Sequence, residues 1–149
     1  VGIGIDISQE AIIQARENAQ LLKLKERSKF FRSNWFEGLR NLKFDIILCN
    51  PPYISREEKQ DLQDEVLIFD PEQALFSDKK GLADYEIIFS NLAKYLNSNG
   101  IALIEIGYNQ LERVSDLAHL SNLHVYNVSK DLQGIPRCMI LCRPNNTIL

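Results

Sequence analysis

The sequence has few of the residues that build metal centres, disulfide frameworks or membrane spans. Its three cysteines, Cys49, Cys138 and Cys142, lie in apolar runs without metal-ligand spacing, which is typical of reduced core side chains in a cytosolic protein. Its two histidines, His119 and His124, have no partner pattern for a triad or a metal site. No apolar stretch approaches the roughly 20 residues of a membrane span, and no signal peptide opens the chain. These absences predict a cytoplasmic protein that does not contact a membrane.

An excess of positive charge is also missing. The 17 lysines and arginines stand against 20 acidic residues, which gives a net charge of -3 at pH 7. Because non-specific affinity for nucleic acids depends on a basic surface, duplex DNA is a poor candidate ligand and no direct nucleic-acid binding is expected. With 45% apolar and 25% charged residues, the 149-residue chain has the composition of an ordinary globular protein. It contains no repeat and no Gly/Ser linker, so a single core is expected.

Hydrophobic periodicity alternates between the strand and helix patterns along the chain. The third strand candidate is apolar throughout, which suits a sheet covered on both faces. Residues 54–80 are polar and irregular and are expected to form a long loop with a helical turn or two. This alternation predicts an α/β fold with a mainly parallel sheet, closed at one edge by an antiparallel hairpin. Strands are predicted at 1–6, 29–36, 44–49, 101–107, 123–129 and 137–143, and helices at 9–25 (capped by Ser8), 82–96 and 111–118.

Polar side chains follow the first two predicted strands, at the ends where open parallel sheets bind ligands. Asp6 closes the first strand, where its carboxylate can accept hydrogen bonds from ribose hydroxyls or can complete a turn beside the helix cap. Asn34 and Trp35 close the second strand, where an amide and a flat indole can flank a purine ring. A single tryptophan also fits the core. Both interpretations of each position stay open on these residues alone.

The stretch "CNPPYIS" at residues 49–55 ends the third strand with two consecutive prolines. Proline fixes φ and has no N–H, so Pro51-Pro52 predicts a stiff, extended exit whose carbonyl groups are not committed to a helix or a ladder. The Asn50 side-chain oxygen and the Pro51 carbonyl can accept the two N–H hydrogens of a planar amide or amino group. Tyr53 can stack on its face. This arrangement favours electrostatic and positional catalysis at a planar nitrogen, and a rigid structural turn is the alternative.

Four further polar residues lie near strand ends. Glu105 and Gln110 flank the exit of the predicted strand 101–107, where they either support the pocket directly, or are solvated or hold the residues behind it. Arg137 and Asp131, near the predicted hairpin, can form an ion pair that steadies the turn.

Several segments together resemble the HemK/PrmC family of release factor glutamine methyltransferases. The resemblance covers essentially the whole chain, and NPPY combined with "DPEQAL" and "EIGYNQ" is far more specific than NPPY alone. The matching stretches are "GIDISQEAIIQARENA", "SNWFEGL", "FDIILCNPPYIS", "FDPEQALFSDKKGLADYEII", "GIALIEIGYNQ" and "DLQGIPRCMI".

The resemblance implies a Rossmann-like class I fold that uses S-adenosyl-L-methionine to methylate the side-chain amide nitrogen of a glutamine. That glutamine belongs to the Gly-Gly-Gln motif of class 1 peptide chain release factors, which would be the protein partners. Asp6 would bind the cofactor ribose, and Asn34 and Trp35 would lie by the adenine. Asn50 would contact both cofactor and substrate. The glutamine pocket and the catalytic group would consist of Asn50, Pro51, Pro52 and Tyr53.

The chain also departs from the family pattern. Asn34 stands where the family usually carries aspartate, and because an amide is also a donor, weaker or altered selectivity is expected. Val1 lies in mid-strand, so the family's first strand, its Gly-rich turn and the N-terminal helical domain that recognises the release factor are expected to be missing. Residues 1–149 are therefore interpreted as a partial catalytic domain. The missing strand should leave a gap in the sheet with unpaired backbone groups on both sides.

Two alternatives to this function remain. An exocyclic amine of adenine presents the same two donors as a glutamine amide, so an N6-adenine nucleic-acid methyltransferase fits the NPPY signature. The acidic charge argues against it. The second alternative is an inactive fragment of the family, or one that needs a partner to supply the first strand.

Overall fold

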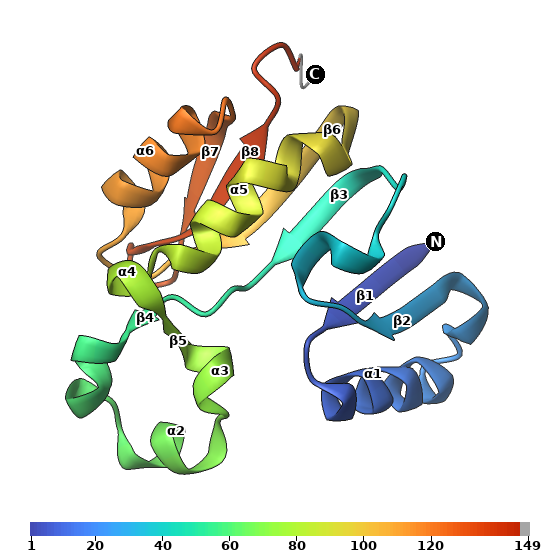
Figure 1. Cartoon of the computed structure of the whole chain (residues 1–149), viewed down its shortest axis with the longest axis horizontal. Coiled ribbons are helices and arrows are strands. Elements are labelled where there is room, and N and C mark those ends of the chain that lie inside the picture. The colour runs from blue at the N-terminus through green and yellow to red at the C-terminus, as the bar shows by residue number, and fades with distance from the viewer. Residues whose placement is uncertain (147–149) are drawn as a thin grey trace. The chain divides into compact units, whose positions relative to one another are not determined.

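The structure is a computed structural model that describes residues 1–146, which fall into two compact units. The first unit is Val1–Leu42 and the second begins at Lys43 (Figure 1). The boundary between Leu42 and Lys43 carries no Gly/Ser linker, so composition gave no signal for it.

The N-terminal unit is a β-α-β segment. Strands β1 (Gly2–Asp6) and β2 (Ser28–Arg32) pair in parallel, and helix α1 (Gln9–Leu21) connects them through the short helix η1 (Lys25–Arg27). The predicted cap is confirmed, because the Ser8 hydroxyl accepts a hydrogen bond from the Ala11 N–H at 3.1 Å. The helix was predicted to extend to residue 25, but α1 ends at Leu21.

The second strand is shorter than predicted. It ends at Arg32, and Trp35–Gly38 form the 3-10 helix η2 instead of continuing the strand to residue 36. Ser33 causes the turn: its hydroxyl donates to the Trp35 carbonyl at 3.0 Å and accepts from the Gly38 N–H at 3.0 Å. Such side-chain bonds to the backbone compete with strand pairing.

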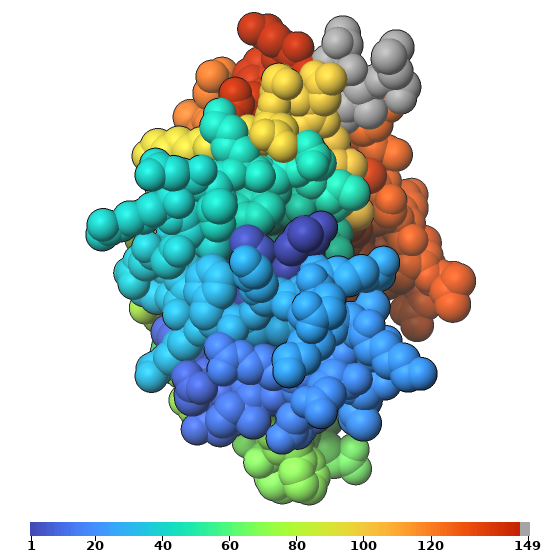
Figure 2. Space-filling view, turned by 90° about the vertical axis from the view of Figure 1, so that its right-hand side faces the viewer, coloured from blue at the N-terminus to red at the C-terminus, as the bar shows by residue number. Residues whose placement is uncertain are grey.

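The core of the N-terminal unit is small. Four of its residues are buried, namely Ile12, Ala19, Ser33 and Leu39. Most of its other side chains form the surface drawn in blue tones in Figure 2. A two-stranded sheet with one helix buries little apolar area, so this unit gains little free energy of folding from its own core.

The C-terminal unit contains a mixed sheet in the order β3-β6-β8-β7. β3 (Phe44–Cys49) and β6 (Leu96–Glu105) are parallel. β8 (Pro136–Cys142) pairs antiparallel with β6 and with β7 (His124–Lys130), which confirms the antiparallel hairpin at one edge. The predicted ion pair in the hairpin is also present, at 3.4 Å between Arg137 Nε and Asp131 Oδ2.

Two helices, α5 (Ala83–Tyr95) and α6 (Leu111–Leu120), lie side by side over one face of this sheet (Figure 1). The predicted apolar stripe of α5 is confirmed. The segment "NSNG" was expected to end the helix, but it lies inside β6. The core between helices and sheet contains Tyr85, Leu92, Ala102, Ile104, Val114, Ala118, Met139 and Leu141, all 0% exposed.

The other face of β3 is open. Its side chains Ile46 and Leu48 are 61% and 75% exposed, so the predicted coverage of both sheet faces is wrong for this strand. β1 pairs only with β2, and β3 pairs only with β6, among the strands of residues 1–146. This division into separate sheets agrees with the expected interruption of the sheet.

Residues 54–81 are more ordered than the predicted loop. They leave the carboxyl end of β3 and return before α5, with α2 farthest from the sheet in Figure 1. β4 and β5 pair in parallel at the base, which fixes the two ends of the segment beside each other. In order, the elements are β4 (Ile54–Ser55), η3 (Arg56–Asp61), α2 (Asp64–Phe69), α3 (Glu72–Leu75), β5 (Phe76–Ser77) and α4 (Asp78–Gly81).

Candidate active site

The predicted NPPY segment follows β3 directly, at the carboxyl end of the strand. The side chain of Asn50 is exposed, and Pro51 is buried. Within residues 1–146, no hydrogen bond engages the Asn50 side chain or the Pro51 carbonyl oxygen. Neither oxygen is therefore committed to a partner within the described chain. Asn50 is open to solvent at the end of the strand where ligands bind in open parallel sheets, whereas the buried Pro51 is less than 2% exposed.

A small open pocket of about 130 Å³ begins at this segment. Of the predicted residues, Asn50, Pro51 and Tyr53 line this pocket. Pro52 is half-buried and is not among the described residues that line it. Ala74 and Leu75, on and next to the last turn of α3, complete the wall with Ile54. Sequence reasoning missed Ala74 and Leu75, although "DPEQAL" was recognised as a specific segment.

Tyr53 is held at both its ring and its backbone. Its hydroxyl donates a hydrogen bond to Glu105 Oε1 at 2.9 Å, and its carbonyl accepts one from Gln110 Nε2 at 2.8 Å. Burial, followed by the hydrogen bond and the charge of Glu105, raises the pKa of the Tyr53 hydroxyl above its usual value. The hydroxyl therefore stays protonated at neutral pH and keeps donating. Glu105 and Gln110 do not line the pocket but bond to Tyr53, which does, so the structure confirms the interpretation in which they act through a neighbouring residue.

Gln110 connects three parts of the site. Its Oε1 accepts the Gly107 N–H at 3.1 Å, and the Tyr85 hydroxyl lies 3.4 Å from the same atom. The Tyr85 hydroxyl also donates to the Glu105 carbonyl at 2.9 Å. Because Gln110 is buried, loss of its amide would leave the Tyr53 carbonyl and the Gly107 N–H without these partners.

A left-handed turn lies behind Tyr53. Lys79 and Lys80, inside α4, have φ values of 55° and 58°, and Gly81 has 79°. A Cβ atom on Gly81 would lie 2.0 Å from the Tyr53 carbonyl oxygen, so this position requires glycine. Consecutive left-handed residues with side chains are strained, and such strain concentrates at functional sites. In the sequence, the only sign of this left-handed turn is the single glycine of "KKG".

Cys49 is adjacent to the site but is not a nucleophile. Burial, with a smaller contribution from the charge of Asp84, raises the pKa of its thiol to about 12. The thiolate is the nucleophilic form, so a thiol that stays protonated does not support covalent catalysis. All three cysteines are free, as predicted. The described part of the chain holds no cluster of metal-ligating side chains and no helix long and apolar enough to cross a bilayer.

Three of the four residues predicted to bind the cofactor, Asp6, Asn34 and Trp35, share one edge of the N-terminal unit, whereas Asn50 belongs to the C-terminal unit. Asp6 ends β1, and its carbonyl accepts the Ser33 N–H at 2.9 Å, next to Asn34 and Trp35. One carboxylate oxygen of Asp6 accepts the Ser8 N–H at 2.8 Å, and the other makes no hydrogen bond within residues 1–146. Asn34 Nδ2 donates to Glu37 Oε1 at 3.2 Å.

Trp35 is half-buried and has a φ of 46°, a rare value for a bulky residue. The edge therefore offers a free carboxylate oxygen, the Asn34 amide oxygen and a partly open indole. Acceptors of this kind and a flat apolar ring fit the ribose hydroxyls and the base of a nucleoside.

A family model described as "Methyltransferase domain" matches residues 2–137. The chain belongs to the methyltransferase domain family. The fold agrees: a methyltransferase from Pyrococcus furiosus superimposes with a TM-score of 0.68 at 14% identity, over 93% of this chain and 60% of that one. The fold is thus the predicted Rossmann-like, class I methyltransferase fold.

Two curated relatives are similar over nearly the whole length of this methyltransferase chain. A "Bifunctional methyltransferase" of Rickettsia felis is 42% identical over 97% of the chain and 27% of the relative. A "Release factor glutamine methyltransferase" of Caulobacter vibrioides is 36% identical over 93% of the chain and 48% of the relative. The chain spans between a quarter and a half of the length of these relatives.

Proposed function

We propose that this chain is the catalytic part of an S-adenosyl-L-methionine-dependent methyltransferase. Its substrate is the side-chain amide nitrogen of the glutamine in the Gly-Gly-Gln motif of class 1 release factors, which are cytoplasmic proteins. The observation that carries the proposal is the pair of free acceptors on Asn50 and Pro51 beside a pocket walled by Tyr53. Similarity to release factor glutamine methyltransferases supports the choice of substrate.

The chemistry follows from the weak nucleophilicity of an amide nitrogen, whose lone pair is delocalised into the carbonyl group. S-adenosyl-L-methionine, when bound, supplies an electrophilic methyl group. Asn50 Oδ1 and the Pro51 carbonyl accept the two N–H hydrogens, which favours positive charge on nitrogen and fixes the orientation of its lone pair. The backbone that carries the Pro51 acceptor is held in place, because Pro51 is buried and Gln110 holds the carbonyl of Tyr53.

The N-terminal unit supplies acceptors for the cofactor. The free oxygen of Asp6 would accept hydrogen bonds from the ribose hydroxyls, and Trp35 would hold the adenine. Glu37 accepts one of the two N–H hydrogens of the Asn34 amide, so Asn34 offers a ligand its oxygen and its second N–H. Asn34 is therefore both an acceptor and a donor, unlike the aspartate of the family, and altered selectivity stays the expectation.

Mass spectrometry of a purified class 1 release factor tests this function. The release factor is incubated with the full-length protein that carries this chain and with S-adenosyl-L-methionine. The Gly-Gly-Gln peptide should gain the mass of one methyl group on the glutamine. An unchanged peptide would contradict the proposal. Adenine-containing DNA and RNA, assayed in parallel, should remain unmodified, and their methylation would favour the N6-adenine alternative.

A calorimetric titration tests the third possibility, a chain that binds no cofactor. Titration of the 149-residue chain with S-adenosyl-L-methionine should release heat that Asp6→Ala reduces. No heat from the unaltered chain would show that this chain does not bind the cofactor without further residues.

A further inference from the structure

The charge of the chain is concentrated in one segment beside the candidate pocket. Residues 56–72, which we name the acidic arm, contain seven acidic and two basic residues, a net charge of -5. The whole chain has 20 acidic and 17 basic residues, so the rest has 13 and 15, a net charge of +2. The negative charge of the molecule thus belongs to the arm.

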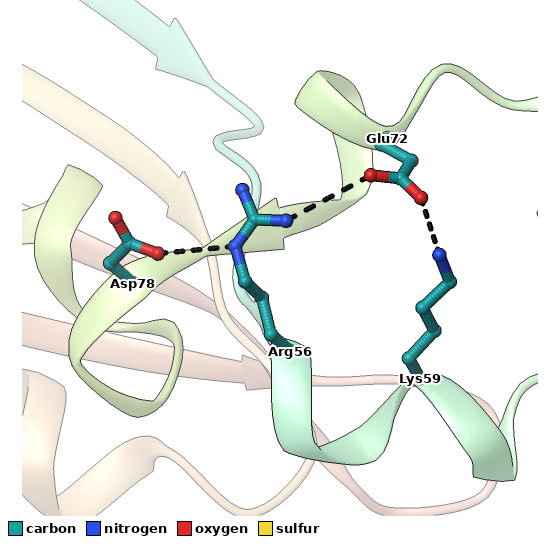
Figure 3. Close-up of polar contacts among 4 residues, drawn as sticks. All are labelled: Arg56, Lys59, Glu72 and Asp78. Carbon is teal, nitrogen blue, oxygen red and sulfur yellow. Dashed lines mark hydrogen bonds and ion pairs between the residues drawn. The ribbon is translucent and has the colours of Figure 1, made fainter.

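Both basic side chains of the arm are already paired. Arg56 contacts Glu72 at 3.8 Å and Asp78 at 3.2 Å, and Lys59 forms an ion pair with the same Glu72 (Figure 3). Ser55 and Glu58 form a capping box at the start of η3. These contacts fix the base of the arm. The exposed carboxylates of the arm that have no ion pair within residues 1–146 are those of Glu57, Glu58, Asp61, Asp64, Glu65 and Asp70.

The far end of the arm is apolar and exposed. The last four residues of α2 read "VLIF", and Ile68 and Phe69 are 71% and 80% exposed. Val66 and Leu67 are half-buried. Exposed single apolar residues are ordinary, but two large adjacent ones at the end of a surface helix offer a contiguous apolar patch of the kind that binding surfaces use. The surrounding carboxylates repel anionic lipid surfaces and nucleic acids. A protein that presents an apolar groove with a basic rim has the complementary chemistry.

The arm is also joined to the pocket. The chain passes from Glu72 through α3, whose last turn brings Ala74 and Leu75 to the pocket wall beside Asn50. A protein held by the arm would therefore have its own surface loops close to the Asn50 and Pro51 acceptors. Tethering of this kind raises the effective concentration of a short target segment at the pocket.

We propose that the acidic arm is the docking surface for the protein substrate, with Ile68 and Phe69 in an apolar groove and the arm's carboxylates facing a basic rim. This inference rests on the proposed function, because it takes the substrate to be a folded release factor. It assigns to the arm a contribution to the affinity for the whole protein, and the chemistry to the pocket.

Steady-state methylation kinetics with two substrates test the docking surface. The substrates are an intact class 1 release factor and a short peptide that contains Gly-Gly-Gln, both with the full-length protein. Ile68→Ser/Phe69→Ser and Asp61→Lys/Glu65→Lys should each raise KM for the release factor about tenfold or more. Both variants should leave kcat/KM for the peptide within about twofold of the unaltered protein. The charge variant should also weaken the dependence of KM on salt.

Matched substitutions on another surface provide the control. Leu120→Ser/Leu132→Ser removes two exposed apolar side chains elsewhere, and Glu112→Lys/Asp116→Lys makes the same charge change on α6. These variants should bind and methylate the release factor normally. An unchanged KM in the arm variants, or an equal loss with the peptide, would overturn the docking surface while the function stands. An unaltered protein that methylates neither substrate would refute the proposed function, and the docking partner with it.

Discussion

At the scale of single residues, the site depends on a few atoms that fix the backbone of Tyr53. Gln110 holds its carbonyl, Glu105 holds its hydroxyl, and the absence of a side chain at Gly81 leaves room for it. The pocket is therefore preorganised by the hydrogen bonds to Tyr53 and by the close approach of Gly81 to the Tyr53 carbonyl, and not by its lining residues alone.

Gly81 provides a direct test of this close approach, and Gly134 provides its control. Both have positive φ, at 79° and 82°, but a Cβ on Gly134 would meet no atom within 4 Å. Gly134→Ala should lower the free energy of unfolding by about 1 kcal/mol through backbone strain alone. Gly81→Ala should lower the free energy of unfolding by about 1–3 kcal/mol more than Gly134→Ala does, because the Cβ at position 81 would overlap the Tyr53 carbonyl. Urea denaturation measures both, and equal losses would show that Tyr53 does not approach Gly81.

The Tyr53 hydroxyl predicts a pH dependence on the alkaline side. Its pKa is raised in the folded chain, chiefly by burial, above the value near 10 of an unfolded tyrosine. Its hydrogen bond to Glu105 should therefore stabilise the fold fully below pH 10 and be lost as pH rises through the folded pKa. The absorbance of tyrosinate is measured against pH for the unaltered chain and for Tyr53→Phe. The difference between the two curves reports Tyr53 and should have its midpoint above about pH 10. Tyr126→Phe controls for the loss of one chromophore, and a Tyr53 midpoint at or below 10 would contradict the hydrogen bond.

At the scale of elements, sequence periodicity predicted the long helices and strands and missed the short ones. α5, α6 and the β7-β8 hairpin carry buried stripes or alternation over many residues, which is the signal that periodicity detects. Elements of two to six residues between 54 and 81 are too short for it. Contacts between distant positions stabilise them, such as Arg56 with Asp78.

The candidate site shows the same division. NPPY and the strand ends were predictable because proline, asparagine and aspartate restrict local backbone and chemistry. The contribution of Ala74 and Leu75 was not predictable, because no property of these residue types marks a pocket wall. Nor was that of Tyr85, whose hydroxyl contacts Glu105 and Gln110 behind the site. The Ser33 turn that places Trp35 in a left-handed conformation was also missed, since aromatic residues around it favour a strand.

The N-terminal unit should be the least stable part of the chain, because it buries only four residues. Native-state hydrogen exchange should show amides of β1 and β2 exchanging at least about tenfold faster than those of β6 and β8, whose side chains reach 0% exposure. Equal protection factors in the two sheets would show that the unit has stability its own core does not explain.

At the scale of the whole molecule, charge and chemistry are divided between segments. Within the C-terminal unit, the arm carries the negative charge and an exposed apolar end, whereas the pocket at its base carries the neutral acceptors. Such a division suits an enzyme that recognises a folded protein but modifies one side chain of it. The overall net charge of -3 conceals this asymmetry.

The central claim is that Asn50 and Pro51 hold the amide nitrogen of a glutamine, and methylation by an Asn50→Ala variant tests it most directly. The full-length protein, its Asn50→Ala variant and the control Asn99→Ala, an exposed asparagine in β6, are incubated with the Gly-Gly-Gln peptide and S-adenosyl-L-methionine. Circular dichroism should show the same fold in all three. Asn50→Ala should lower the methylation rate about 100-fold or more, while Asn99→Ala leaves it unchanged. A folded Asn50→Ala variant that methylates the glutamine at the unaltered rate would contradict the account.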